Sequence, residues 1–128
     1  MSNNKSIIQT NNAPQAIGTY SQAVKAGPMV FISGQIALDP NTGEMQQSSM
    51  EAEIEQVFQN LIAIVNAAGA KTQDVVKITL FLTDLAQFGL VNDIMARHFS
   101  EPYPARAAVG VSALPKGARF EAEAIIIV

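Results

Sequence analysis

The sequence predicts a single α+β domain, in which one β-sheet carries two helices on one of its faces. Its 128 residues fit one domain with a sizeable core. Apolar residues recur at helical spacing in two segments and alternate with polar residues in others. The elements follow the order β-β-α-β-α-β-β, with no internal linker. The sheet face without helices then needs a cover, and its Ala, Val and Ile content favours contact with other subunits.

The first elements are extended. Residues 1–12 form a polar lead-in that we expect to be mobile, within one domain spanning residues 1–128. The lead-in has neither the apolar stretch of a secretory signal nor the arginines of a mitochondrial presequence. Thr19–Lys25 and Met29–Ile32 flank a Gly-Pro pair, which predicts a β-hairpin. Ser33–Gln35 ends the second strand.

An amphipathic helix begins near residue 49. Ser48 or Ser49 can cap its first turn, and Gly69 provides a stop signal. Its apolar positions recur every three or four residues, as expected for one buried helical face: Ile54, Val57, Phe58, Leu61, Val65 and Ala68.

A strand and a second helix follow. Val76–Leu82 alternates apolar and polar side chains and is rich in β-branched residues, which predicts a strand. Asp84 can cap a helix that ends before Pro102 and Pro104. The apolar stripe of this helix consists of Phe88, Val91, Met95 and Phe99.

Two further strands complete the chain. Ala107–Val111 predicts a short strand, and Leu114–Gly117 a turn. Arg119–Val128 predicts the last strand, with an alternating first half. Because Ile125–Val128 is apolar on both faces, we expect it to lie centrally in the sheet or at an interface.

The composition restricts the partners. A net charge of −3 and a pI near 5.0 disfavour a nucleic-acid partner. No segment has the roughly 18 consecutive apolar residues of a membrane span, so we expect a cytoplasmic protein. Charged residues make up 15% of the chain, against about 25% in typical soluble domains. This favours self-association, although a monomer coated with Ser, Thr, Asn and Gln is the alternative.

Familiar catalytic motifs are missing from the sequence. There is no cysteine, no glycine-rich phosphate loop and no histidine pair at metal-ligand spacing. We therefore expect neither a metal nor a cofactor. His98 is the single histidine, and its place at the end of an apolar helical stripe favours a structural role.

Arg106 is the strongest candidate for ligand binding. It lies where a proline-restricted segment enters an apolar strand, and the chain has only three arginines. A guanidinium pairs bidentately with a carboxylate. An internal salt bridge to Glu121 or Glu123 explains the position equally well. Glu121 itself could act as a general acid or base, or belong to a solvated strand face.

Three weaker candidates lie near the first strands. Tyr20 sits at the start of the first predicted strand, and Ser33 and Gly34 end the second. A glycine there allows a ligand to approach the backbone, although a simple turn would also explain it.

Taken together, these segments resemble the Rid family, the reactive-intermediate deaminases also called the YjgF family, most closely its RidA subfamily. The resemblance runs from about Asn12 to Ile127, and the order and spacing of its pieces are specific. It is carried by Asn12-Ala13-Pro14, Ile17 to Ala23, Ile32 to Gln35, Asn60-Leu61, Ala67 to Gly69, Val91-Asn92, Pro104 to Arg106, Leu114 to Gly117 and Glu121 to Ala124.

The resemblance implies a chorismate-mutase-like α+β fold with a mixed sheet, and homotrimers with clefts between subunits. It implies hydrolytic deamination of short 2-imino acids, such as 2-iminobutanoate and 2-iminopropanoate, to 2-keto acids and ammonia. The family's carboxylate-binding arginine falls on Arg106, and its water-side glutamate on Glu121. Substrate-binding positions fall on Tyr20, Ser33, Gly34, Asn92 and the backbone amide of Ala108.

The chain departs from the family pattern at three places. Thr19 replaces a common proline before Tyr20. Ala108 stands where cysteine is frequent, which keeps the amide and removes thiol chemistry. Gly110 replaces a common Glu or Gln, which we expect to widen or soften the cleft floor.

Other functions fit this resemblance as well. A non-enzymatic regulatory protein could use the Arg106 cleft to bind a small metabolite. Chorismate mutase activity would require more converging cations than three arginines and five lysines offer. Ribonuclease or translation-inhibitor activity fits poorly with the acidic pI.

Overall fold

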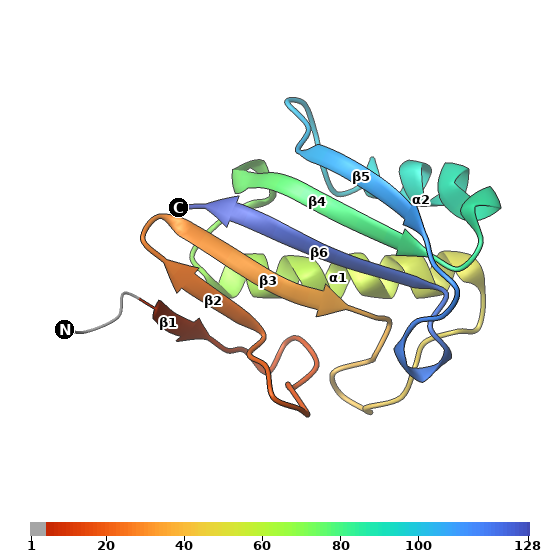
Figure 1. Ribbon diagram of the computed structural model, residues 1–128, viewed down its shortest axis with the longest axis horizontal. Helices are drawn as coiled ribbons and strands as arrows, with labels where there is room; N and C mark the ends of the chain where they lie inside the picture. Colours follow the sequence, from red (N-terminus) through yellow and green to blue (C-terminus); the bar gives the residue numbers. More distant parts are fainter. Residues whose placement is uncertain (1–4) are drawn as a thin grey trace.

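The computed structural model describes residues 5–128, which form one sheet with two α-helices on one face (Figure 1). In chain order the strands and α-helices are β1 (Lys5–Ile8), β2 (Ala23–Ala26), β3 (Met29–Gln35), α1 (Met50–Ala67), β4 (Val75–Leu82), α2 (Phe88–Met95), β5 (Ala105–Gly110) and β6 (Phe120–Ile127). Short 3-10 helices cover Thr72–Asp74, Leu85–Gln87 and Pro115–Gly117. The predicted single α+β domain with a mixed sheet is confirmed.

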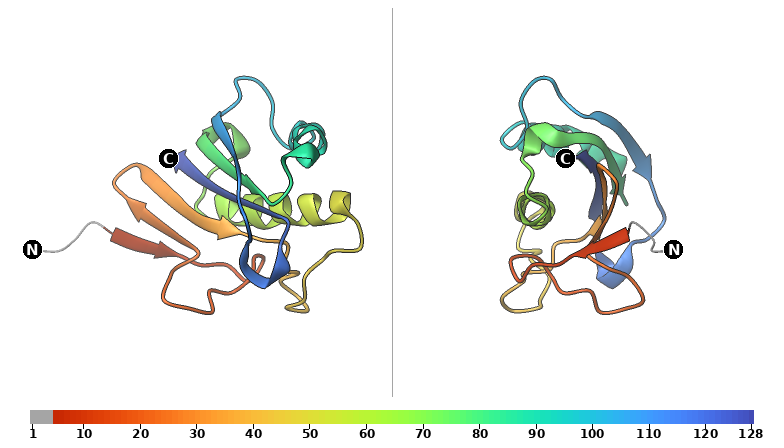
Figure 2. Two further views of the ribbon diagram at one scale, coloured as in Figure 1. Left: turned by 45° about the vertical axis from the view of Figure 1, so that its right-hand side comes forward. Right: turned by 90° about the vertical axis from the view of Figure 1, so that its left-hand side faces the viewer.

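The sheet order is β1-β2-β3-β6-β4-β5. Only β4 and β5 pair in parallel, because the connection between them runs through α2 on the helical face. All other neighbours are antiparallel. Figure 2 shows α1 lying along one face of the curved sheet, while the opposite face carries no helix. The two ends of the sheet are therefore the short β1 and the parallel β5.

The core lies between α1 and the sheet. In β6, residues Phe120, Ala122, Ala124 and Ile126 are buried, whereas the residues between them are partly or fully exposed. This alternation confirms the prediction from the sequence, and β6 is a central strand as expected for its apolar end. The helix contributes its apolar stripe to the same core, including Ile54, Phe58 and Leu61, all fully buried.

Capping fixes the position of α1. Ser49 accepts a hydrogen bond from the Ala52 amide at 3.0 Å, which settles the choice between two serines. At the other end Gly69 has a φ of +78°, the left-handed conformation that ends many helices. Buried Glu53 anchors the first turn to β6, since its carboxylate accepts from the Arg119 Nε at 2.7 Å and from the Arg119 amide at 2.8 Å.

Several elements differ from the sequence prediction. The strand predicted over Thr19–Lys25 is confined to β2, so Tyr20 lies in the loop before the strand and not at its start. Lys5–Ile8 forms β1, paired with β2, so part of the lead-in expected to be mobile is a strand; residues 1–4 lie outside the described residues. Asp84 caps a 3-10 turn that precedes α2, through a bond from the Ala86 amide. Strand β5 begins at Ala105, two positions earlier than predicted, because it continues its pairing with β4.

The helix-free sheet face carries exposed apolar side chains. Phe31, Val109 and Ile127 are each about two-fifths exposed, at 43%, 40% and 39%.

Among residues 5–128, no helix is long and apolar enough to cross a membrane.

Candidate active site

Glu121 lies in a pocket on the helix-free side of the sheet, which we call the Glu121 pocket. The pocket has a volume of about 560 Å³. Glu121 comes from the central strand β6, and alternation with buried Phe120 and Ala122 directs its side chain to this face. Three predicted site residues lie in the same lining, namely Tyr20, Ser33 and Gly34, together with Lys116 and Glu123.

Gly34 creates the space for the Glu121 carboxylate. A Cβ placed on Gly34 would collide with Oε2 of Glu121 and lie 2.9 Å from its Cδ. The pairing of β3 with β6 also shifts register between Ile32 and Gln35, a bulge that includes Gly34. Glycine is therefore required here by the close approach of a side chain, which is more specific than the turn considered from the sequence.

The Glu121 carboxyl is electrostatically perturbed. Burial disfavours its charged form, and the neighbouring carboxylate of Glu123 disfavours it further, so the pKa of Glu121 lies above its ordinary value. Such a carboxyl holds its proton more tightly than a solvated one. Glu123, on the same strand face, is more exposed to solvent than Glu121.

Ser33 connects the pocket to the preceding loop. Its Oγ donates to the Ser21 carbonyl at 2.5 Å, and its amide donates to the Gln22 carbonyl at 3.0 Å. The hydroxyl is thus engaged with backbone in this structure. Ser33 shapes the wall next to Gly34.

Arg106 lies in a different pocket, of about 370 Å³, which we call the Arg106 pocket. Its Nη1 donates to Oδ1 of Asn92 at 2.8 Å and contacts Sδ of Met95 at 3.8 Å. The guanidinium also lies 4.8 Å from the Phe88 ring centroid, a cation–π contact. Nε and Nη2 have no hydrogen-bond partner within residues 5–128. Two donors remain for a carboxylate.

No internal salt bridge holds Arg106 among the described residues. Arg119 pairs with Glu53, and Arg97 pairs with Glu51 and Glu55. The alternative of a bridge from Arg106 to Glu121 or Glu123 is therefore wrong for this structure.

Within one chain, the two pockets lie on opposite faces of the sheet. Arg106 is in register with buried Ile78 and contacts α2, which places it on the helical side. Glu121 is in register with Phe81 on β4 and faces the other side. The register offset and the two strand spacings separate the two residues by roughly 10 Å along the sheet and roughly 10 Å across it. A four-carbon ligand cannot touch both in one protomer.

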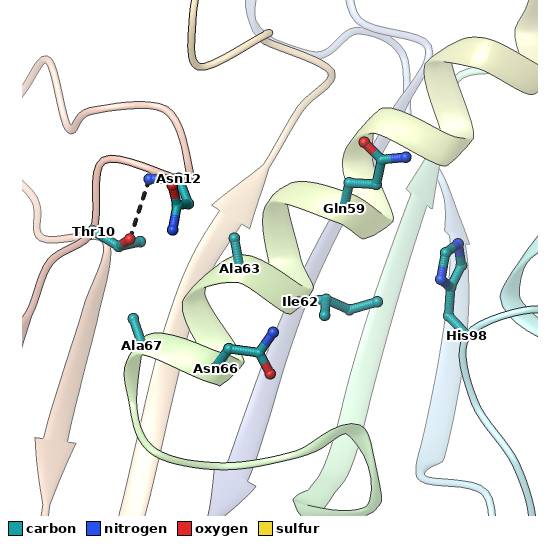
Figure 3. A pocket seen from close by; sticks show the side chains of 8 residues that line it. All are labelled: Thr10, Asn12, Gln59, Ile62, Ala63, Asn66, Ala67 and His98. Carbon is teal, nitrogen blue, oxygen red and sulfur yellow. Dashed lines mark hydrogen bonds between the residues drawn. The ribbon is translucent and has the colours of Figure 1, made fainter.

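A third hollow lies on the outer face of α1; His98 lines it, and none of the predicted site residues does (Figure 3). His98 packs 5.9 Å from the Phe58 ring centroid, and its Nε2 lies 2.9 Å from Glu55. Burial acts to raise the pKa of Glu55, but hydrogen bonds from His98 and Gln59 outweigh it and lower the pKa. The structural interpretation of His98 is confirmed. In the part of the chain described, no three His, Asp or Glu side chains could hold a metal ion.

Comparisons with known proteins agree with this architecture. The model of the family Endoribonuclease L-PSP matches residues 10–128. The chain belongs to this family, also known as the YjgF or Rid family. A 2-iminobutanoate/2-iminopropanoate deaminase of Dermatophagoides farinae is 47% identical, covering 97% of both chains. A RutC family protein of Sinorhizobium fredii is 50% identical over 93% of this chain and 94% of its own.

A solved Rid structure has the same fold. RidA from the Antarctic bacterium Psychrobacter sp. PAMC 21119 superposes with a TM-score of 0.92 at 52% identity, covering 96% of this chain and 99% of that one. Curated relatives thus include named deaminases and proteins that carry a family name alone.

The structure clarifies one departure of this Rid protein from the family pattern. The cleft floor at Gly110 was expected to be wider or softer. That effect on the cleft stays a prediction; within one chain, Leu85 covers the glycine, and a Cβ added there would lie 3.0 Å from the Leu85 Cδ1. The space is therefore filled by a leucine that is 52% exposed.

Sequence reasoning missed two contributors to this Rid site. Phe88 supports the Arg106 guanidinium, although the sequence marked it only as part of a core stripe. Lys116 lines the Glu121 pocket and adopts a positive φ of 57°, unusual for a residue with a side chain. Its neighbour Gly117 gave only a turn signal.

Proposed function

We propose that this Rid protein hydrolyses short 2-imino acids, such as 2-iminobutanoate and 2-iminopropanoate, in clefts between the subunits of a homotrimer. The observation that carries the proposal is the separation of Arg106 and Glu121 onto opposite sheet faces. Arg106 has free donors for a carboxylate, and Glu121 has a perturbed carboxyl in a pocket of its own. A second copy, seated with its Glu121 pocket against the Arg106 pocket, would supply both groups to one ligand.

Two further findings support the assembly. The helix-free face exposes Phe31, Val109 and Ile127, which a neighbouring subunit would bury. The chain also carries few charges for a lone domain.

The cytoplasmic location stays a prediction.

In the proposed mechanism, Nε and Nη2 of Arg106 bind the substrate carboxylate, with the Ala108 amide beside them. Asn92 and Phe88 hold the guanidinium in orientation. The ionised Glu121 orients a water and accepts its proton as the water oxygen bonds to the imine carbon. Glu121 passes this proton to the imine nitrogen, which gives a carbinolamine. The carbinolamine hydroxyl then gives its proton to Glu121, which returns it to nitrogen as the C–N bond breaks and the C=O bond forms, so the products are ammonia and a 2-keto acid.

Positioning supplies much of the rate gain, since an imine already reacts with water. Tyr20, Ser33 and Gly34 shape the cavity around the reacting carbon. No group needs to form a covalent bond with the substrate.

The test couples the protein to a threonine dehydratase that releases 2-iminobutanoate, and follows 2-ketobutyrate. Arg106→Ala should lower kcat/KM by about a hundredfold or more. Arg97→Ala, which removes an exposed arginine that pairs with Glu51 and lines neither pocket, serves as the matched control. An Arg106→Ala variant as fast as the parent would remove the assignment. A parent that binds a keto acid in calorimetry without accelerating hydrolysis would instead be a regulatory metabolite-binding protein.

Subunit complementation tests the shared cleft. Arg106→Ala and Glu121→Gln should each be inactive alone. Refolded together in equal amounts, they should regain activity, because roughly a quarter of the clefts of a cyclic trimer then pair an intact Arg106 with an intact Glu121. No recovery, or a monomer mass in sedimentation equilibrium, would contradict the intersubunit site.

A further inference from the structure

The loop of residues 9–22, between β1 and β2, forms one wall of the Glu121 pocket. It contributes Pro14, Ile17, Tyr20 and, at its end, Gln22 to the lining. Ile17 is 71% exposed and Tyr20 is 51% exposed, so neither is held by burial in the core. Their position over the pocket therefore depends on what fixes the loop backbone.

Gln22 fixes this backbone from inside. The side chain is only 3% exposed and lies at the end of the loop, directly before β2. Its Oε1 accepts from the Thr10 amide at 2.7 Å. Its Nε2 donates to the carbonyls of Thr10 at 3.0 Å, Pro14 at 2.8 Å and Ala13 at 3.4 Å. One carboxamide thus joins the end of the loop to its beginning.

No other natural side chain of this length replaces the carboxamide. Glutamate would keep the acceptor but, when ionised, would present oxygen to three carbonyl oxygens. Methionine would leave the Thr10 amide and the Pro14 carbonyl without partners in a buried place. A second attachment comes from Ser33, whose hydroxyl holds the Ser21 carbonyl. The segment between these attachments carries Tyr20.

We propose that Gln22 is a positioning residue of the Glu121 pocket: its buried carboxamide fixes the loop of residues 9–22 and thereby holds Tyr20 at the pocket wall. The role rests on the proposed function, which places the substrate in this pocket. Although Gln22 also borders the pocket, its carboxamide is engaged by the backbone of Thr10, Ala13 and Pro14, so it acts through the loop.

The first test compares Gln22→Glu with Gln15→Glu in the coupled imine assay. Gln15 belongs to the same loop and also reaches the Thr10 carbonyl, at 3.4 Å, but it is exposed, so its variant adds the same charge and leaves the buried Gln22 carboxamide in place. At about pH 8, Gln22→Glu should raise KM about tenfold with little change in kcat, because the loop shapes binding. As the pH falls to about 6, the KM should return toward that of the parent, because a protonated carboxyl can again donate to a carbonyl.

The second test does not depend on activity. The chain has no tryptophan and two tyrosines, so a Tyr103→Phe background leaves Tyr20 as the single fluorophore. Adding Gln22→Glu should increase acrylamide quenching of Tyr20 about twofold at about pH 8, and Gln15→Glu should not change it. If Gln22→Glu does not fold, Gln22→Met replaces it in both tests, with an expected rise in KM and quenching at every pH.

The outcomes separate the two proposals. A parent without imine hydrolysis would refute the proposed function, while the quenching result would still decide whether Gln22 holds Tyr20. A Gln22 variant with lower thermal stability but parental KM and quenching would show a merely structural glutamine and overturn the inference. Parental KM with increased quenching would also overturn it, since the loop would then move without affecting the substrate.

Discussion

The close approach of Gly34 to Glu121 makes Gly34→Ala the most informative single substitution. A Cβ at this position would occupy the place of Oε2 of Glu121 and press on its Cδ and Cγ, which lie 2.9 and 3.3 Å away. The φ of Gly34 lies outside the left-handed region, so the backbone accepts alanine. The conflict is therefore confined to the Glu121 side chain, which can rotate away from the pocket floor.

The magnitudes follow from that geometry. Moving a side chain off its preferred rotamer costs about 0.5–1.5 kcal/mol, so the free energy of unfolding should fall by no more than this. General acid–base assistance is worth about 10²–10⁴-fold in rate. We expect kcat for 2-iminobutanoate to fall by about a hundredfold, with the fold intact by circular dichroism.

The control is Gly89→Ala, because a Cβ on Gly89 meets no atom within 4 Å. Its kcat should match that of the parent. In a Glu121→Gln background, Gly34→Ala should cost almost nothing more, since both changes remove the same carboxylate. A Gly34→Ala enzyme with parental kcat would refute the role assigned to Glu121.

Two predictions concern stability. Folded Glu121 keeps its proton to a higher pH than the unfolded chain, whose carboxyl titrates near 4.5; the parent therefore loses stability as the pH rises from about 4.5 through the raised pKa. Glu121→Gln should have a higher Tm than the parent at about pH 7, with the difference shrinking toward about pH 4, and equal differences at both pH values would contradict this. Arg119→Met leaves buried Glu53 without its charged partner and should cost about 3 kcal/mol in urea unfolding. Arg97→Met breaks an exposed pair with Glu51 and should cost less than about 1 kcal/mol, so similar losses in the two variants would count against the buried pair.

The periodicity of apolar residues predicted the elements that pack one face against the core. In β6 and α1, the spacing of apolar residues reflects which side chains are buried. Ser49 and Gly69 correctly marked the ends of α1. The sequence of β1 has no such apolar pattern. Lys5–Ile8 is almost entirely exposed. It is a strand because its backbone pairs with the edge of β2, a tertiary contact that local sequence does not reveal. The early start of β5 has the same origin, since Ala105 extends a ladder with Lys77.

The candidate site was predictable by residue type but not by arrangement. Scarcity and chemistry pointed to Arg106, and the family resemblance pointed to Glu121. Neither could show that the two side chains leave the sheet on opposite faces, because that depends on the register of β5 against β4. Gln22 belongs to a segment that carries the family resemblance, but nothing in the sequence showed that its carboxamide is buried, since a single polar residue before a strand has no periodicity.

The contacts of Arg106 with Asn92 and Phe88 bear on how tightly so small a ligand can bind. A free arginine side chain carries about 2 kcal/mol of rotamer entropy, and here the hydrogen bond and the ring contact already restrict that freedom in the folded chain. A ligand such as 2-iminobutanoate has roughly seven non-hydrogen atoms, each contributing at most about 1.5 kcal/mol of binding free energy. A guanidinium ordered during folding leaves more of that limited free energy for affinity toward the proposed substrate.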